Sequence, residues 1–138
     1  MITLHLDVPP RWTYPDRRVD AIRGCVAIER GPLVYCFEQA DQPPNAGLDD
    51  LALVDGAALR ERTATLPRIG PTVVIDADAA SLRPPGPGGP GGLPYTTQPP
   101  PASGDPVTAT AVPYFQWDNR DGRAMRVWLP RSGAIETR

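Results

Sequence analysis

The sequence predicts an all-β fold, an antiparallel β-sandwich of jelly-roll-like type with about eight to nine short strands. Two observations predict it. Short apolar and β-branched runs recur along the chain, separated by turn residues that include many of its 19 prolines and 13 glycines. No stretch of about ten or more residues has helical periodicity with caps at both ends. At 138 residues, the chain is expected to form one domain around one core.

The first expected strand is residues 2–8, where apolar residues alternate with threonine, histidine and aspartate. This period of two is typical of a strand that is buried on one face. Pro9 and Pro10 are expected to end the strand, because proline cannot donate a hydrogen bond to a neighbouring strand.

The strongest local signal is a β-hairpin over residues 25–38, where two β-prone runs flank Arg30 and Gly31. With these two residues as the turn, Val26 lies opposite Tyr35 on one face of the hairpin. The other face is equally apolar. A hairpin that is apolar on both faces is expected in the middle of a two-layer structure.

Further strands follow the hairpin. They are expected at residues 51–54, 59–66, 72–76, 107–113 and 124–129. The last two ranges are predicted to pair as a second hairpin, because a cluster of turn residues at 118–122 lies between them.

Between residues 84 and 106, 15 of 23 positions are proline or glycine. Such a composition cannot sustain a strand ladder or a helix, so this range is predicted to be a flexible, exposed loop. The 32 residues after it are too few to close a second core. The loop is therefore interpreted as an insertion between two strands of a single domain over residues 1–138.

Charge and hydropathy exclude several classes of function. The formal net charge is −2, and the 14 Lys and Arg residues are all arginines, so no basic field is present for nucleic acid or anionic lipid. The longest apolar run, residues 33–37, is far shorter than the roughly 20 residues needed to span a bilayer. His5 and Asp7 interrupt the apolar start of the chain, so no signal peptide is predicted and a cytoplasmic location is expected.

One histidine and two cysteines are too few for a zinc site, so no metal or cofactor is expected. Cys25 and Cys36 lie in apolar strands, far along the chain from His5, and are interpreted as buried, unreactive thiols. The predicted hairpin register also places the two cysteines opposite each other. A cross-strand disulfide therefore remains as an alternative.

Two aspartate pairs are candidates for the carboxylates of a glycosidase, Asp76 with Asp78 and Asp118 with Asp121. Such a pair must flank one sugar ring, and one carboxyl must have a raised pKa. Asp76 ends a strand and Asp121 precedes a glycine, which are positions typical of solvated aspartates. No catalytic residue is therefore expected in this chain.

Four aromatic residues lie within fifteen positions, at Tyr114, Phe115, Trp117 and Trp128. Three interpretations stay open: the rings close the core, pack against a neighbouring domain, or stack on a sugar. An exposed, coplanar pair of rings would favour a sugar site. Burial of Trp117 and Trp128 would disfavour it.

Two segments resemble motifs of glycoside hydrolase family 127. Residues 23–36, RGCVAIERGPLVYC, are similar to the family's run G-x-V-A-hydrophobic-x-R-G-P-L-V-Y-C. Residues 112–120, VPYFQWDNR, are similar to its later segment hydrophobic-P-Y-Y/F-x-W-x-N-R, and residues 125–129 continue the likeness. Order and spacing match over nearly the whole chain apart from the loop at 84–106.

The resemblance implies one part of a larger enzyme. Members of the family are β-L-arabinofuranosidases and relatives, with an (α/α)6-barrel catalytic domain followed by β-sandwich domains. Catalysis in the family is attributed to a zinc-held cysteine nucleophile and a glutamate acid/base in the barrel. This chain resembles only the C-terminal β-sandwich, so the zinc would belong to the missing catalytic domain. Cys25 and Cys36 inherit no catalytic role.

The expected function is that of a non-catalytic C-terminal domain, which packs against and supports the catalytic barrel or mediates oligomer contacts. The candidate residues for such an interface are Tyr114, Trp117, Asn119, Arg120 and Trp128. The alternative is a carbohydrate-binding module, in which the same residues contact arabinose-containing glycans with weak affinity.

Overall fold

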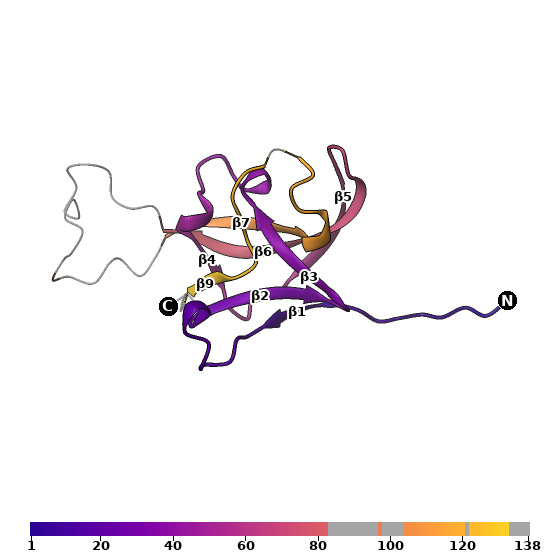
Figure 1. Cartoon of the computed structure of the whole chain (residues 1–138), viewed down its shortest axis with the longest axis horizontal. Helices are drawn as coiled ribbons and strands as arrows, with labels where there is room; N and C mark the ends of the chain where they lie inside the picture. Colours follow the sequence, from indigo (N-terminus) through magenta and orange to yellow (C-terminus); the bar gives the residue numbers. More distant parts are fainter. Residues whose placement is uncertain (83–96, 98–103, 121, 133–138) are drawn as a thin grey trace.

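The computed structural model describes residues 1–82, 97, 104–120 and 122–132 and confirms the predicted all-β fold (Figure 1). Nine strands and several short 3-10 helices lie within these residues. The strands are β1 (Pro10–Thr13), β2 (Cys25–Arg30), β3 (Leu33–Glu38), β4 (Leu51–Val54), β5 (Arg60–Leu66), β6 (Gly70–Ser81), β7 (Asp105–Pro113), β8 (Met125–Arg126) and β9 (Leu129–Ser132). The 3-10 helices are η1 (Asp20–Ile22), η2 (Gln39–Asp41), η3 (Leu48–Asp50) and η4 (Tyr114–Gln116). None of the helices in this part of the chain has the length and apolar character needed to cross a membrane.

The sheet closes into a barrel, whereas the sequence predicted a jelly-roll-like sandwich. Hydrogen bonding runs from β2 through β9, β4, β6, β7 and β3, and β3 pairs back onto β2, so six strands complete the ring. The remaining strands extend the ring, with β1 on β2, β5 on β6 and β8 on β3. Alternating strands are typical of sandwiches and barrels alike, so the sequence pattern could not distinguish closure from two separate sheets.

The predicted hairpin forms, but its turn lies one residue later than expected. Gly31 and Pro32 form the turn in place of Arg30 and Gly31. Gly31 has a φ of +54°, which suits the first central position of a type II′ turn and costs glycine no steric strain. The register therefore differs from the prediction by two residues, and Val26 does not lie opposite Tyr35. Because two is an even number, every side chain keeps its predicted face.

The two cysteines lie on strands that diverge. Cys25 pairs with Pro130 of β9, whereas Cys36 pairs with Val112 of β7. Both thiols are free, so the predicted juxtaposition of the cysteines and the alternative of a disulfide are wrong. The closed ring causes this divergence, because β2 and β3 each turn away to bond their next neighbour. Cys36 is buried as predicted, but Cys25 is only half-buried.

Residues 2–8 do not form the predicted first strand. They extend away from the barrel as an exposed segment (Figure 1). β1 begins instead at Pro10, which pairs with Arg30 at the end of β2. Beyond Arg30 the chain turns back into β3, so the edge of β2 offers residues 2–8 nothing to pair with.

The C-terminal strands differ from the predicted second hairpin. The strand expected at 124–129 is divided into β8, which pairs with β3, and β9, which pairs with β2 and β4. β7 pairs with β3 and β6 instead. After β8 the chain leaves β3, and β9 lies between β2 and β4, where its pairing with both strands closes the ring. The predicted loop at 84–106 lies outside the described residues apart from residues 97 and 104–106, and β7 already begins at Asp105.

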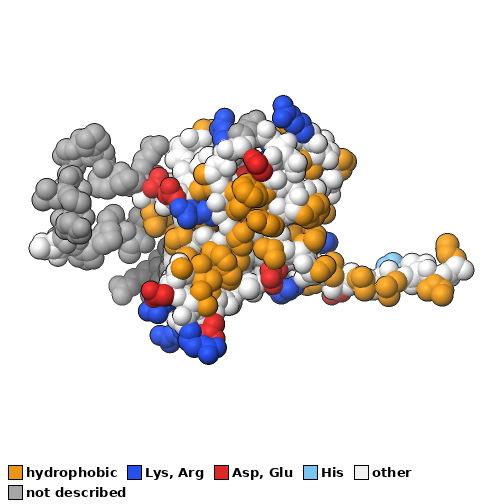
Figure 2. All heavy atoms as spheres, viewed as in Figure 1, with side chains coloured by type: hydrophobic (Ala, Val, Ile, Leu, Met, Phe, Trp, Pro, Cys, Tyr) orange, Lys and Arg blue, Asp and Glu red, His pale blue; other side chains and the backbone are white. Residues whose placement is uncertain are grey.

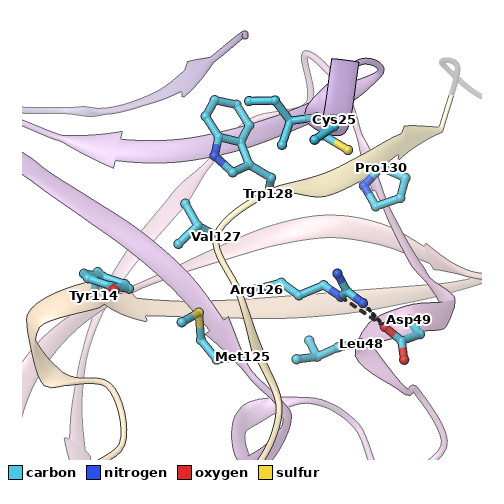
Figure 3. Close-up of a pocket in the computed structure, with 11 residues that line it drawn as sticks. Cys25, Leu48, Asp49, Tyr114, Met125, Arg126, Val127, Trp128 and Pro130 are labelled. Carbon is cyan, nitrogen blue, oxygen red and sulfur yellow. Dashed lines mark hydrogen bonds and ion pairs between the residues drawn. The ribbon is translucent and has the colours of Figure 1, made fainter. Parts of the chain in front are cut away.

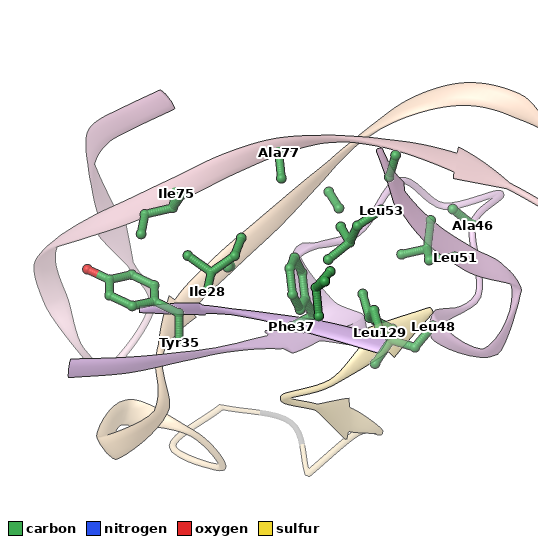
Figure 4. Close-up of a cluster of buried hydrophobic side chains, with 14 residues drawn as sticks. Ile28, Tyr35, Phe37, Ala46, Leu48, Leu51, Leu53, Ile75, Ala77 and Leu129 are labelled. Carbon is green, nitrogen blue, oxygen red and sulfur yellow. The ribbon is translucent and has the colours of Figure 1, made fainter. Parts of the chain in front are cut away.

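The barrel core combines small side chains from two strands with large ones from the others (Figure 4). β6 and β7 contribute alternate alanines, whereas β2, β3 and β4 contribute bulky residues such as Ile28, Phe37 and Leu53. A smaller cluster around Cys36 and Val74 packs on the opposite face of the sheet. The hairpin is therefore apolar on both faces, as predicted.

Phe37 and Phe115 provide a matched test of the core, because Phe37 is fully buried and Phe115 is exposed. Phe37→Ala removes a packed ring and leaves a cavity, so the free energy of unfolding is expected to fall by about 3–5 kcal/mol. Phe115→Ala is expected to change it by about 0.5 kcal/mol or less. Urea unfolding followed by circular dichroism measures both values. Equal losses would contradict the packing.

Candidate functional site

The loop that follows β7 presents three aromatic side chains to solvent. This aromatic loop, residues 114–120, begins with η4, where the Trp117 N–H donates to the Tyr114 carbonyl oxygen at 3.0 Å. Tyr114, Phe115 and Trp117 are 44%, 67% and 39% exposed. The rings of Tyr114 and Trp117 stack, with centroids 6.0 Å apart and planes inclined by 21°. Exposed aromatic rings on a short turn are typical of a surface that another molecule covers.

Arg120 holds the far end of the aromatic loop in a buried ion cluster. Its guanidinium contacts Glu38 and makes two hydrogen bonds of 2.5 Å to the two carboxylate oxygens of Asp41. The side chains of Arg120, Glu38 and Asp41 are only 7%, 6% and 9% exposed. The hydrogen bonds with Asp41 raise the pKa of Arg120, although burial opposes them, so the guanidinium stays charged.

Further hydrogen bonds fix the shape of the loop between η4 and Arg120. The backbone of Asp118 has a φ of +62°, and its N–H donates to Glu38 Oε1 at 3.3 Å. The side-chain amide of Asn119 donates to the carbonyl oxygens of Gln116 and Trp117 at 2.9 and 3.3 Å. The aromatic loop is thus ordered before any partner binds, which reduces the conformational entropy lost on binding.

A groove of about 630 Å³ lies beside the aromatic loop (Figure 3). Tyr114, Val127 and Trp128 line it, and an ion pair between Arg126 and Asp49 lies at its margin. Its other lining residues are mostly apolar: Ala21, Ile22, Cys25, Leu48, Met125 and Pro130. Figure 2 shows hydrophobic side chains gathered across this side of the molecule. Because Tyr114 belongs to both, the aromatic loop and the groove form one continuous surface, which we call the apolar face.

The structure distributes the predicted candidate residues over different roles. Tyr114 and Trp128 line the groove, and Trp117 stacks on Tyr114. Asn119 is exposed and bonds the loop backbone. Arg120 points inward to Glu38 and Asp41, so it holds the aromatic loop in place and does not belong to the exposed surface. The two tryptophans of the set, Trp117 and Trp128, are neither fully buried nor paired with each other.

Sequence reasoning missed the partners of Arg120 and most of the groove. Glu38 and Asp41 lie 82 and 79 positions from Arg120 in the sequence. One signal was present, because Glu38 directly follows the apolar run of β3, and a buried carboxylate requires a cationic partner. With 14 arginines available, the sequence did not identify which one it would be. The groove residues come from six separate runs of the chain, so no single sequence motif contains them all.

Of the two aspartate pairs considered as catalytic carboxylates, Asp76 and Asp78 are each bound to an arginine. Asp76 forms an ion pair with Arg62 and accepts a hydrogen bond from Thr110. Burial alone raises the pKa of Asp76, but these hydrogen bonds outweigh it and lower the pKa below its usual value. The general acid of a glycosidase needs the opposite shift. Asp78 pairs with a different arginine, and Asp121 lies outside the described residues.

The residues present do not fit the zinc site that the resemblance implies for the catalytic barrel. Across the described part of the chain, no three histidine, cysteine, aspartate or glutamate side chains gather as metal ligands would. Cys25 and Cys36 lie on diverging strands with different neighbours. No chemical step through a metal is therefore assigned to these residues.

Comparison with known proteins identifies relatives of this chain. The family model described as glycoside hydrolase family 127 C-terminal domain matches residues 10–130. A curated protein from Bifidobacterium longum subsp. longum, a non-reducing end β-L-arabinofuranosidase, is 33% identical over 143 aligned positions. This alignment covers 94% of the present chain and 19% of the Bifidobacterium protein.

Solved structures share the fold. The crystal structure of a GH127 β-L-arabinofuranosidase from Geobacillus stearothermophilus T6 superposes with a TM-score of 0.74 and 30% identity, over 91% of this chain and 18% of that chain. A chain described as a glycoside hydrolase superposes with a TM-score of 0.75 and 25% identity, over 93% and 20% of the two chains. The present chain thus spans about a fifth of the length of the relatives that it matches.

Arg120→Met tests the buried ion cluster. It is expected to lower the free energy of unfolding by about 3–5 kcal/mol, because it leaves Glu38 and Asp41 buried without a counter-charge. Arg126→Met is the matched control, since Arg126 pairs with Asp49 at an exposed site, and it is expected to cost at most about 1 kcal/mol. Urea unfolding measures both. A loss at Arg120 no larger than that at Arg126 would contradict the role assigned to the cluster.

Alkylation distinguishes the two thiols. Burial raises the pKa of the Cys36 thiol to about 12, whereas Cys25 is half-buried at the groove. At pH 8, iodoacetamide is expected to modify Cys25 in the native protein and to modify Cys36 only after denaturation. Mass spectrometry measures the modification, and the folded Cys25→Ser variant should not react with iodoacetamide. Rapid native labelling of Cys36 would contradict its burial.

Cys36 also predicts a pH dependence of stability. Its folded pKa of about 12 lies above the ordinary thiol value of 9.0. The contribution of the buried thiol is therefore fully present below about pH 9 and is lost as the pH rises toward 12, because the unfolded chain ionises first. Urea unfolding at pH 8 and pH 10.5 is expected to show a smaller loss of stability in Cys36→Ala than in the unaltered chain. An equal loss in both proteins would contradict this assignment.

Proposed function

Because this chain belongs to the glycoside hydrolase family 127 C-terminal domain family, we propose that it serves as the non-catalytic C-terminal domain of a β-L-arabinofuranosidase-like glycoside hydrolase. In that role it packs against the (α/α)6-barrel catalytic domain and supports it. The match to only about a fifth of each relative supports this proposal. The nucleophile, the acid/base and the zinc then belong to the part of the enzyme outside the matched region.

The observation that carries the proposal is an exposed aromatic loop held in shape from inside the protein. Tyr114, Phe115 and Trp117 face solvent, and tyrosine and tryptophan are enriched among the residues that dominate binding energy at interfaces. A buried ion cluster such as that of Arg120 adds little net stability because its charges must be desolvated. Its placement directly behind the loop supports a role in positioning the rings.

The groove enlarges the surface that a partner domain can cover. Val127 and Trp128 add apolar area next to Tyr114. The exposed ion pair of Arg126 and Asp49 lies at the margin. An apolar centre with a polar rim is the usual composition of a protein interface. The apolar face therefore suits a neighbouring domain better than it suits open solvent.

Carbohydrate binding is the second candidate. Tyr114 and Trp117 are exposed and stacked, and flat rings of this kind can pack on a sugar. However, the two rings cover one face of each other, which reduces the area left for a sugar. The matched relatives are named as arabinofuranosidases or as a glycoside hydrolase, so they lend this candidate no additional support.

Phe115→Ala/Trp117→Ala tests the proposed docking. The partner is the Geobacillus enzyme truncated before the matched 18%, and calorimetry measures binding to the present chain. Saturable binding is expected, with affinity reduced by at least about thirtyfold in the double variant, because rings at the centre of an interface each contribute strongly. Leu82→Ala, at an exposed residue after β6, is the control and should bind as the unaltered chain does.

Parallel titrations separate the alternatives. A saturable response to L-arabinose oligosaccharides that the double variant abolishes would favour a carbohydrate-binding module. Self-association that the double variant abolishes would make a second copy the partner. If the unaltered chain does not bind the truncated enzyme, the proposed function fails.

A further inference from the structure

A strand pattern with one apolar face lies outside the barrel. In residues 2–8, Ile2, Leu4 and Leu6 are 99%, 77% and 71% exposed, and polar residues alternate with them. The segment pairs with no strand among the described residues and projects from the barrel (Figures 1 and 2). A period of two is that of a strand buried on one face. Among the described residues, no sheet buries this apolar face.

The adjoining sheet edge cannot accept the segment. β1 follows β2 only as far as Pro10 opposite Arg30, where the hairpin turn begins. Val8 packs beside this turn, so closely that a Cβ on Gly31 would lie 3.2 Å from Val8 Cγ1. The segment therefore runs past the end of the sheet. Pro9 and Pro10 restrict its direction, because the proline ring fixes φ.

The family boundary coincides with this change in structure. The family model begins at residue 10, which is the first residue of β1. About four-fifths of each relative lies outside the matched region, and the description of the domain as C-terminal places that part before it. The relatives thus provide a preceding domain at the position toward which residues 2–8 lead.

We propose that residues 2–8 form an edge strand in a sheet of the preceding domain, with Ile2, Leu4 and Leu6 buried against that domain. Main-chain hydrogen bonds supply affinity for the sheet edge, and the alternating apolar side chains set the register. Pro9 alone separates this strand from β1, so the strand restricts how the two domains are oriented. The inference rests on the proposed function, since it requires the chain to be part of a larger enzyme.

The test uses a complete enzyme in which this whole chain replaces the matched C-terminal 18% of the Geobacillus β-L-arabinofuranosidase. Leu4→Asp/Leu6→Asp places charges on the apolar face, and Thr3→Asp/His5→Asp places the same number on the polar face. The first pair is expected to lower the Tm of the enzyme by about 5 °C and the second by at most about 1 °C. In the isolated chain neither pair should change the Tm, because all four residues are exposed there.

Hydrogen–deuterium exchange provides a second readout. Amides of residues 2–8 are expected to exchange without protection in the isolated chain and at least about tenfold more slowly in the complete enzyme. Rapid exchange in the complete enzyme, or equal effects of the two pairs on its Tm, would overturn the proposal. If the hybrid enzyme does not fold, the same pairs at the aligned positions of the unaltered Geobacillus enzyme decide the question by the same criteria.

The failure of this inference is distinguishable from the failure of the proposed function. Phe115→Ala/Trp117→Ala in the same enzyme tests the aromatic loop. If this variant lowers the Tm while residues 2–8 exchange rapidly, only the strand proposal fails. If it has no effect while Leu4→Asp/Leu6→Asp lowers the Tm, only the docking of the apolar face fails. Self-association of the isolated chain that Leu4→Asp/Leu6→Asp abolishes would assign the strand to a second copy and overturn the proposal.

Discussion

Closure of the sheet depends on small side chains facing large ones across a narrow interior. Ala77 and Ala79 of β6 and Ala109 and Ala111 of β7 point into the barrel, and they leave room for rings such as that of Phe37. A ring of six strands has little internal volume, so bulky residues on every strand would hold it open. Because the ring closes, β3 lies between β2 and β7 and also bonds β8. The position of β3 therefore also sets the positions of Glu38, its last residue, and of η2, which follows it.

The shape of the apolar face depends on the residues at the end of β3. Glu38 is the last residue of β3 and Asp41 lies in η2 directly after it, so the closed sheet places both carboxylates where Arg120 can reach them. This pairing fixes a loop whose rings Tyr114 and Trp117 contribute little to the core. A buried ion pair is a costly way to gain stability but a specific way to select one loop conformation. Glu38, Asp41 and Arg120 therefore connect the closed sheet to the shape of the exposed aromatic loop.

Local features were predictable from the sequence because their causes lie within a few residues of one another. The limits of β4 and the identity of the hairpin strands follow from short apolar runs, and Gly31 marks the turn. The predicted faces of the hairpin survived an error in register because the shift was even. Residues 2–8 show the limit of such reasoning: their alternation signals a strand, but pairing depends on a neighbour that the described barrel does not provide.

The sequence by itself determined the all-β class, most strand positions and the cluster of aromatic residues at the C-terminal end, together with a likeness to one enzyme family. Only the tertiary structure decided that the sheet closes, that Cys25 and Cys36 separate, and that Arg120 turns inward to Glu38. The reason is physical. Periodicity and turn chemistry act between near neighbours. The ion pairs of Arg120 join groups about 80 positions apart, and ring closure joins groups as far apart as Cys25 and Pro130. The energies of these contacts depend on a burial that exists only once the chain has folded.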